Sequence, residues 1–170
     1  MSLYRQTLPQ QRKMLQNLDH WLDKAVTFAE GKKFDANTLL VARLAPDQFA
    51  LARQVQAVCD NAKMTAVRLT GRTAPAHPDV ETTIPELKAR IGSVIEFLNG
   101  LQESDYAGAE SRLIELPFAP GMVIRGDDYV VDMALPNFYF HATTAYAILR
   151  HNGVDLGKRD FLGTIALVSR

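Results

Sequence analysis

The polar residues with the clearest chemical potential lie between Pro136 and Gly163, a stretch that also contains the densest aromatic cluster of the chain. Asn137 and His141 are four positions apart, so a helix would place them one turn apart on the same face. Apolar side chains share that face, namely Ala134, Ala145 and Ile148. We therefore expect Asn137 and His141 to point into the interior of the protein.

Gln54 is expected on an apolar helix face earlier in the chain, because apolar residues lie three positions before it and four positions after it. A buried amide or imidazole without a partner costs about 1–3 kcal/mol. We therefore predict that Gln54, Asn137 and His141 meet one another, a water molecule or a ligand. Tyr146 is a further candidate for lining such a ligand pocket, although aromatic residues also form subunit interfaces.

His141 has two interpretations at this stage. It is either a core histidine that hydrogen-bonds to Gln54, Asn137 or a hydroxyl group, or part of a binding site at the centre of a helical bundle, where facing helices commonly build such sites. Metal ions such as zinc favour imidazole, thiolate and carboxylate ligands, so one histidine with two amides is a poor zinc site. Cys59, the single cysteine, lies on an apolar helix face and is expected to be a buried thiol.

Four long amphipathic segments must position these residues. Apolar residues recur at helical spacing in four stretches, and each stretch is bounded by capping or stop residues. The approximate bounds are Leu8–Ala29, Asp47–Leu69, Thr83–Leu98 and Asp127–Asn152. With modest connectors between them, these segments predict an all-α four-helix bundle that forms a single domain over residues 1–170.

Several residues predict where these helices begin and end. Thr7 and Gln10 have the spacing of a capping box, whereas a start near Ser2 would place Pro9 further into the helix and kink it. Gly31 marks the predicted end of this first helix. The predicted N-caps of the other helices are Asp47, Thr83 (with Glu86 completing a capping box) and Asp127 or Asp128.

The last helix and its flanks contain three further features. Pro136 lies inside the helix, where a proline removes one backbone hydrogen bond, so we expect a kink or break there. The preceding segment, Arg112–Arg125, predicts a short β-hairpin or extended excursion lying on the helices. The tail, residues 154–170, ends in the apolar run Ile165–Val168 and is expected to dock on the bundle or on a second subunit.

The order of these elements and two sequence blocks, ARLAPDQFALARQVQ (42–56) and PNFYFHATTAYAILRHNGVDLGKRDFLG (136–163), resemble a bacterial branch of the DinB/YfiT-like superfamily that is a domain of unknown function. The resemblance covers nearly the whole chain. In the superfamily, a histidine from the second helix and an HxxxH pair from the last helix hold a divalent metal, which some members use in thiol-dependent transferase or isomerase reactions. These positions correspond here to Gln54, Asn137 and His141, so the resemblance implies a degenerate metal site.

Composition limits the partners. Lys plus Arg equals Asp plus Glu at 19 each, so no net field attracts nucleic acid or an anionic membrane. The N-terminus has no apolar run typical of a signal peptide, and no segment is apolar for long enough to span a bilayer. Together with the single cysteine, these features indicate a cytoplasmic protein.

Three functions remain open on this sequence. The first is a degenerate-site bundle protein that binds a small molecule in its core, functions as a homodimer and needs no cofactor. The second is a metal- or thiol-dependent transferase or isomerase that uses His141, with zinc or nickel as the metal. The third is a non-catalytic dimeric interaction module, in which the aromatic residues and the tail serve assembly.

Overall fold

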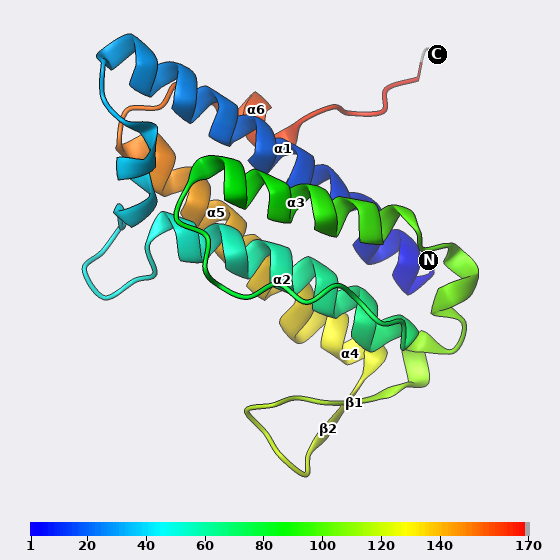
Figure 1. Ribbon diagram of the computed structural model, residues 1–170. Helices are drawn as coiled ribbons and strands as arrows, with labels where there is room; N and C mark the ends of the chain where they lie inside the picture. The colour runs from blue at the N-terminus through cyan, green and yellow to red at the C-terminus, as the bar shows by residue number, and fades with distance from the viewer. Residues whose placement is uncertain (169–170) are drawn as a thin grey trace.

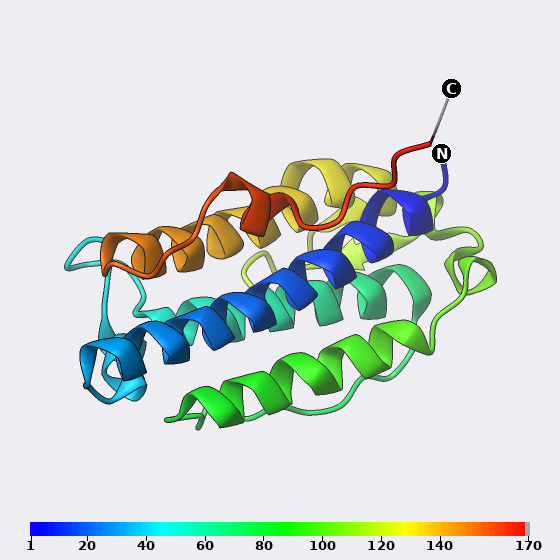
Figure 2. The same ribbon diagram turned by 90° about the horizontal axis from the view of Figure 1, so that it is seen from above.

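The computed structural model describes residues 1–168. Within this range, four long helices pack into a bundle around a core of leucine, valine, alanine and aromatic residues (Figure 1): α1 (Leu3–Lys32), α2 (Leu51–Thr70), α3 (Ile84–Asn99) and α5 (Leu135–His151). Both α1 and α2 pack against α3 and α5, and this arrangement confirms the all-α four-helix bundle predicted from sequence (Figure 2). No helix of the described residues combines the length and the apolar character needed to cross a membrane.

The first helix begins earlier than the capping pattern at Thr7 predicts. Ser2 is the N-cap, and its hydroxyl oxygen accepts a hydrogen bond from the backbone N–H of Arg5 at 3.4 Å. Thr7 instead donates its hydroxyl proton to the carbonyl of Leu3 at 2.7 Å. The alternative start near Ser2 is therefore the one observed, and Pro9 lies inside the helix.

The same helix also ends later than Gly31. Its C-cap is Lys33, which has a left-handed backbone conformation with φ of 62°. The N–H of Phe34 donates to the carbonyl of Ala29 at 3.0 Å, and the ring of Phe34 packs edge-on against that of Phe28 at 5.8 Å. This backbone bond and the apolar contact are the usual features of a helix C-terminus and compensate for the strained conformation of a non-glycine residue.

The N-cap predicted at Asp47 is wrong, because α2 begins at Leu51 with Ala50 as its N-cap and no side chain capping it. The N–H of Leu51 donates to the carbonyl of Ala42 at 2.9 Å, which closes residues 42–50 into a loop. This tertiary bond replaces the local cap. As a result, Phe49 lies outside the helix, with half of its side chain exposed.

The capping box that starts α3 is as predicted. The hydroxyl oxygen of Thr83 accepts from the N–H of Glu86 at 3.4 Å, and the Glu86 carboxylate accepts from the N–H of Thr83 at 2.9 Å. Between α2 and α3, residues 71–83 run back along α2 without regular secondary structure (Figure 1). We call residues 71–83 the strap.

The predicted hairpin forms from β1 (Leu113–Glu115) and β2 (Val123–Arg125), which pair antiparallel with Ile114 opposite Ile124. Ile114 is buried, but the tip projects away from the helices (Figure 1) and leaves Phe118 71% exposed. The hairpin therefore rests on the bundle only through its base. A strand pair this short is stable only through such a contact.

The last helical segment begins with α4 (Gly126–Tyr129), so Asp127 and Asp128 lie in its first turn and not at the predicted N-cap. The N-cap is Arg125, two residues before Asp127, and the chain enters the helix earlier because Gly126 lies against a neighbouring backbone. A Cβ atom at this position would be 1.9 Å from the carbonyl oxygen of Ala109. Only glycine allows this approach, and the contact fixes where the helix starts.

The expected break around Pro136 is a π-helical turn, Val130–Ala134, between α4 and α5. The N–H of Leu135 bonds to the carbonyl of Val130, five residues back. Pro136 is the second residue of α5 and directly follows this wide turn. A single wide turn thus lets one continuous helix contain a proline.

After α5, the chain returns along α1 and forms α6 (Lys158–Leu162) (Figure 2). The indole N–H of Trp21, on α1, donates to the carbonyl of Asp160 at 3.1 Å, and Lys24 binds the Asp160 carboxylate at 2.8 Å. These contacts hold residues 158–162 against the bundle. The apolar run Ile165–Val168 does not bury its large side chains on this chain, since Leu167 is 85% exposed.

Candidate functional site

Gln54 of α2 and His141 of α5 meet inside the bundle. The His141 Nδ1 atom lies 2.7 Å from the Gln54 Oε1 atom, and both residues are buried. The other end of the Gln54 amide is also fixed, because its Nε2 atom donates to the backbone carbonyl of Phe49 at 3.2 Å. The loop that precedes α2 thus provides the third member of the site.

These bonds determine which imidazole nitrogen carries the proton. A carbonyl can only accept, so the bond to Phe49 assigns the NH₂ group of Gln54 to that side and leaves Oε1 facing the histidine. The Nδ1 atom of His141 must then be the donor. In the neutral imidazole, Nε2 is therefore an acceptor with a free lone pair. Within residues 1–168, Gln54 is the only hydrogen-bond partner of this ring.

The surroundings of His141 are aromatic and partly open. Its ring lies 6.3 Å from that of Phe49, nearly parallel to it, and 5.2 Å from that of Phe140, edge-on. Both phenylalanines are about half exposed, whereas His141 is 9% exposed. Burial, with a further effect of the Arg53 guanidinium, lowers the pKa of His141 below its ordinary 6.5. The imidazole is therefore neutral at pH 7, beneath an aromatic rim.

Asn137 does not join this pair, contrary to the expectation that the three residues converge. Its Nδ2 atom donates to the Oδ1 atom of Asn61 at 2.5 Å, and Asn137 is only half-buried. Because α2 and α5 run antiparallel, moving one turn back along α5 moves the contact forward along α2. Gln54 and Asn61 are seven residues apart, so the two amides form successive polar contacts along the same interface.

Tyr146 lies on a different side of α5 from His141. Its ring packs edge-on against Trp21 at 5.4 Å and against Phe161 at 5.6 Å, and its hydroxyl donates to the carbonyl of Leu156 at 3.3 Å. It lines a cavity of about 380 Å³ beside α6. Tyr146 therefore belongs to the contact between the tail and α1, and the sequence signal for it was the aromatic cluster alone.

The described residues do not fit a metal centre of the superfamily type. No three or more His, Cys, Asp or Glu side chains among residues 1–168 are placed to hold one ion. Gln54 already uses both ends of its amide, and Asn137 is bound to Asn61. His141 is then the single strong donor at this place. Cys59 does not help, because complete burial raises the pKa of its thiol to about 12.

A charged network on the other side of α2 was missed by the sequence analysis. The Arg90 guanidinium of α3, 2% exposed, binds Asp60 at 2.8 Å and two strap carboxylates, Asp79 and Glu81, at 3.0 Å each. Burial alone would lower the pKa of Arg90, but its hydrogen bonds and the surrounding carboxylates raise it overall. The available signal was a polar stripe on α2, at steps of three and four: Arg53, Gln56, Asp60 and Lys63.

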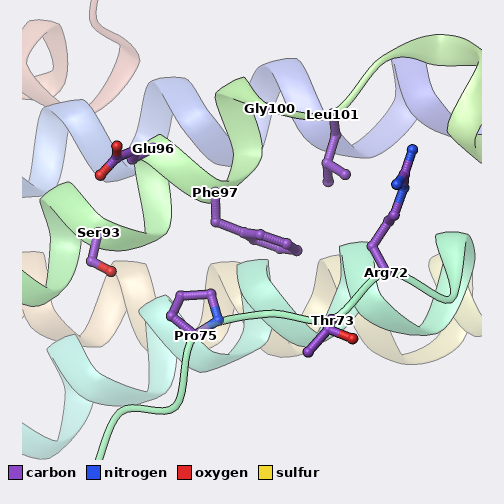
Figure 3. Close-up of a pocket in the computed structure, with 8 residues that line it drawn as sticks. All are labelled: Arg72, Thr73, Pro75, Ser93, Glu96, Phe97, Gly100 and Leu101. Carbon is purple, nitrogen blue, oxygen red and sulfur yellow. The ribbon is translucent and has the colours of Figure 1, made fainter.

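The strap also forms one wall of a surface cavity of about 460 Å³ (Figure 3). Thr73 and Pro75 line this cavity from the strap, Phe97 and Leu101 line it from the opposite side, and Arg72 lies at one end. Arg72 is engaged by Asp105 at 2.5 Å. The cavity is distant in sequence from the predicted site residues, and its opposite wall is the C-terminal half of α3.

Comparison with known proteins agrees with this architecture. The family model of DUF1993, described as a domain of unknown function, matches residues 3–162. A crystal structure of a DinB family member protein from Shewanella denitrificans is 50% identical, with a TM-score of 0.95 over 99% of this chain and 96% of that one. No curated protein matches the chain. The chain therefore belongs to the DUF1993 family and has the fold of the DinB family.

Proposed function

We propose that this protein binds a small molecule at His141, with the Nε2 atom as the hydrogen-bond acceptor and Gln54 as the residue that orients the ring. The observation that carries the proposal is the Gln54–His141 bond at 2.7 Å, which leaves one free lone pair on a buried ring. Within residues 1–168, the Nε2 atom is not among the buried atoms that lack a partner. It therefore reaches the surface, where a ligand that donates a hydrogen bond can replace water.

The rim of the site indicates the chemistry of the ligand. Phe49 and Phe140 expose aromatic surface next to His141. A planar apolar body would cover these rings, while a hydroxyl or amide N–H group reached Nε2. Arg53 is already paired with Asp79 at 2.5 Å and lies over the Phe49 ring at 5.7 Å, so the site offers no free cation for a strongly acidic ligand. We therefore propose a neutral aromatic or amide-bearing ligand.

The binding test uses phenol and benzamide as probes, with benzene as a matched probe that lacks a donor. We expect phenol and benzamide to shift the His141 imidazole resonances in NMR titrations, and to bind about fivefold more tightly than benzene, since a neutral hydrogen bond is worth about 1 kcal/mol. In His141→Phe this preference should disappear, whereas Asn137→Ala should retain it. Equal shifts with all three probes, or none, would exclude the proposal.

An enzyme that uses a metal at His141 is the alternative, because the free Nε2 atom is also the atom that would bind zinc or nickel. Metal analysis of untagged protein separates the two. We expect zinc and nickel to be far below one per chain, and the melting temperature to be unchanged by a chelator. Stoichiometric metal that is lost in His141→Ala would favour the metal-dependent transferase or isomerase.

We also propose that the protein functions as a homodimer, and exposed apolar side chains support this. The tail exposes Ile165, Leu167 and Val168 within four residues of one another. Neighbouring exposed apolar side chains of this kind are typical of an interface. Light scattering should give twice the chain mass, and removal of residues 164–170 should give a monomer. A dimer that survives this truncation would contradict the proposed interface.

A further inference from the structure

His77, at the centre of the strap, joins three parts of the fold. Its Nδ1 atom lies 3.2 Å from the ammonium nitrogen of Lys63 on α2, and its Nε2 atom lies 3.0 Å from the hydroxyl oxygen of Ser93 on α3. Lys63 is charged, because it also binds the Asp60 carboxylate at 3.1 Å. An ammonium group can only donate, so Nδ1 must accept, and the proton of the neutral ring is on Nε2.

This tautomer excludes His77 as a base for Ser93 and makes its position dependent on protonation. With its proton on Nε2, His77 donates to Ser93 and cannot serve as a base that activates the serine hydroxyl. A second proton would have to be placed on Nδ1, directly facing the Lys63 ammonium. The contact that holds the ring would then become a contact between two cations. His77 can therefore occupy this position stably only while its imidazole is neutral.

The charges around His77 favour the neutral ring. Burial and the cations of Lys63 and Arg90 lower the pKa of His77 below its ordinary 6.5. Asp60 and Glu81 act in the opposite direction, with smaller effects. The folded state therefore binds this proton less readily than the unfolded chain does, and the closed strap loses stability as the pH falls below about 6.5.

We propose that His77 is an acid-sensitive latch that keeps the first half of the strap, residues 72–77, on α2 and α3, and that its protonation opens the cavity wall formed by Thr73 and Pro75. The second half of the strap has a separate anchor. Arg90 holds the carbonyl of Pro78 and the carboxylate of Glu81, and an arginine stays charged throughout this pH range. Acid thus releases one half of the strap and leaves the other in place.

Native-state proteolysis tests the latch. Proteinase K, whose broad specificity includes cuts after threonine and alanine, is applied at pH 7.5 and pH 5.5, and cuts within residues 72–77 are identified by mass spectrometry. Rates are divided by those of an unfolded peptide of residues 70–84, which removes the pH dependence of the protease. When opening is fast, the rate follows the population of the open strap. We expect the corrected rate to rise between about twofold and tenfold at pH 5.5, the upper value being the limit for a histidine of pKa 6.5 in the open state.

Variants separate the latch from other histidines. His77→Gln retains a donor for Ser93 but cannot titrate, so its corrected rate should be the same at both pH values. His141→Gln and His20→Gln should keep the full rise. Lys63→Met removes the facing cation and should give a smaller rise than the wild-type protein.

Three results would overturn the proposal. A wild-type rate that does not change with pH would mean that Lys63 turns towards Asp60 and leaves the charged ring in place. A rise in His77→Gln equal to that of the wild-type protein would assign the acid response to another group. Cuts that appear equally within residues 78–83 would likewise contradict a latch confined to the first half of the strap.

Discussion

The two sides of α2 carry polar side chains of very different kinds. Towards α5, Gln54 meets His141 through neutral groups, surrounded by apolar and aromatic residues. Towards the strap, Asp60 meets Arg90 in a network of full charges. A neutral pair can be replaced by apolar groups without leaving a charge behind, whereas each member of a charged network depends on the others. The neutral pair of Gln54 and His141 is therefore suited to a binding site. The charged network of Arg90 is suited to holding the strap against the bundle.

The largest expected effect is that of Arg90→Ala. Loss of the guanidinium leaves Glu81, 11% exposed, without its cation, while Asp60 keeps only its pair with Lys63. Removing one partner of a buried ion pair costs about 3–5 kcal/mol. Urea unfolding followed by circular dichroism measures the loss. Arg53→Ala is the matched control, because its pair with Asp79 is more than 40% exposed on both sides and should be worth about 1 kcal/mol or less. A similar small loss in both variants would show that the Arg90 network is effectively solvated.

A smaller loss of unfolding free energy is expected on the α5 side, and a second substitution should recover most of it. Gln54→Leu leaves the Nδ1 proton of His141 without an acceptor and should cost about 1–3 kcal/mol. The double variant Gln54→Leu, His141→Phe removes both polar groups and should recover most of that loss. A double-mutant cycle measures the coupling.

The half-buried pair of Asn61 and Asn137 provides the control for this cycle. Changing both to alanine should reveal a coupling of only about 1 kcal/mol, since water can replace part of their bond. A coupling larger than that of Gln54 and His141 would reverse the order of the two contacts. It would also move the candidate site towards Asn137.

The fold could be predicted because it depends on local patterns. Helical spacing of apolar residues defines the four long helices, and Thr83 with Glu86 places the start of α3 correctly. The starts of α2 and α4 were missed because non-local contacts decide them. The bond between Leu51 and Ala42 delays α2, and the close approach of Gly126 to Ala109 advances α4. Neither contact can be predicted from the capping residues near these two helix starts.

The candidate site could be predicted only in part, for a related reason. Helical spacing shows that Gln54 and His141 face the interior, but it does not give the register of one helix against another. That register pairs Asn137 with Asn61, a residue that the sequence analysis did not consider. The strap was missed because the partners of Arg90 come from α2 and from an irregular segment. The polar residues of α2 are recognised as part of a charged network only when the positions of Arg90 and the strap are known.

The smallest expected effect separates the two histidines by pH. The lowered pKa of His141 means that the unfolded chain binds its proton more readily. The resulting stability is complete above about pH 6.5, declines as the pH falls below that value, and declines no further below the folded pKa. Between pH 7.5 and 5.5 the loss from one histidine is at most about 1.4 kcal/mol.

Global unfolding and strap opening should respond differently to the same substitutions. His141→Gln should reduce the pH dependence of the unfolding free energy in urea and leave the share that His77 contributes, while cleavage of residues 72–77 keeps its acid response. His77→Gln should remove the acid response of the strap, because its ring contacts Lys63 and Ser93 there. An unfolding profile that His141→Gln leaves unchanged would mean that the ring accepts a proton in place. In that case the site admits charge and water, and the neutral aromatic ligand proposed for it would be the wrong class.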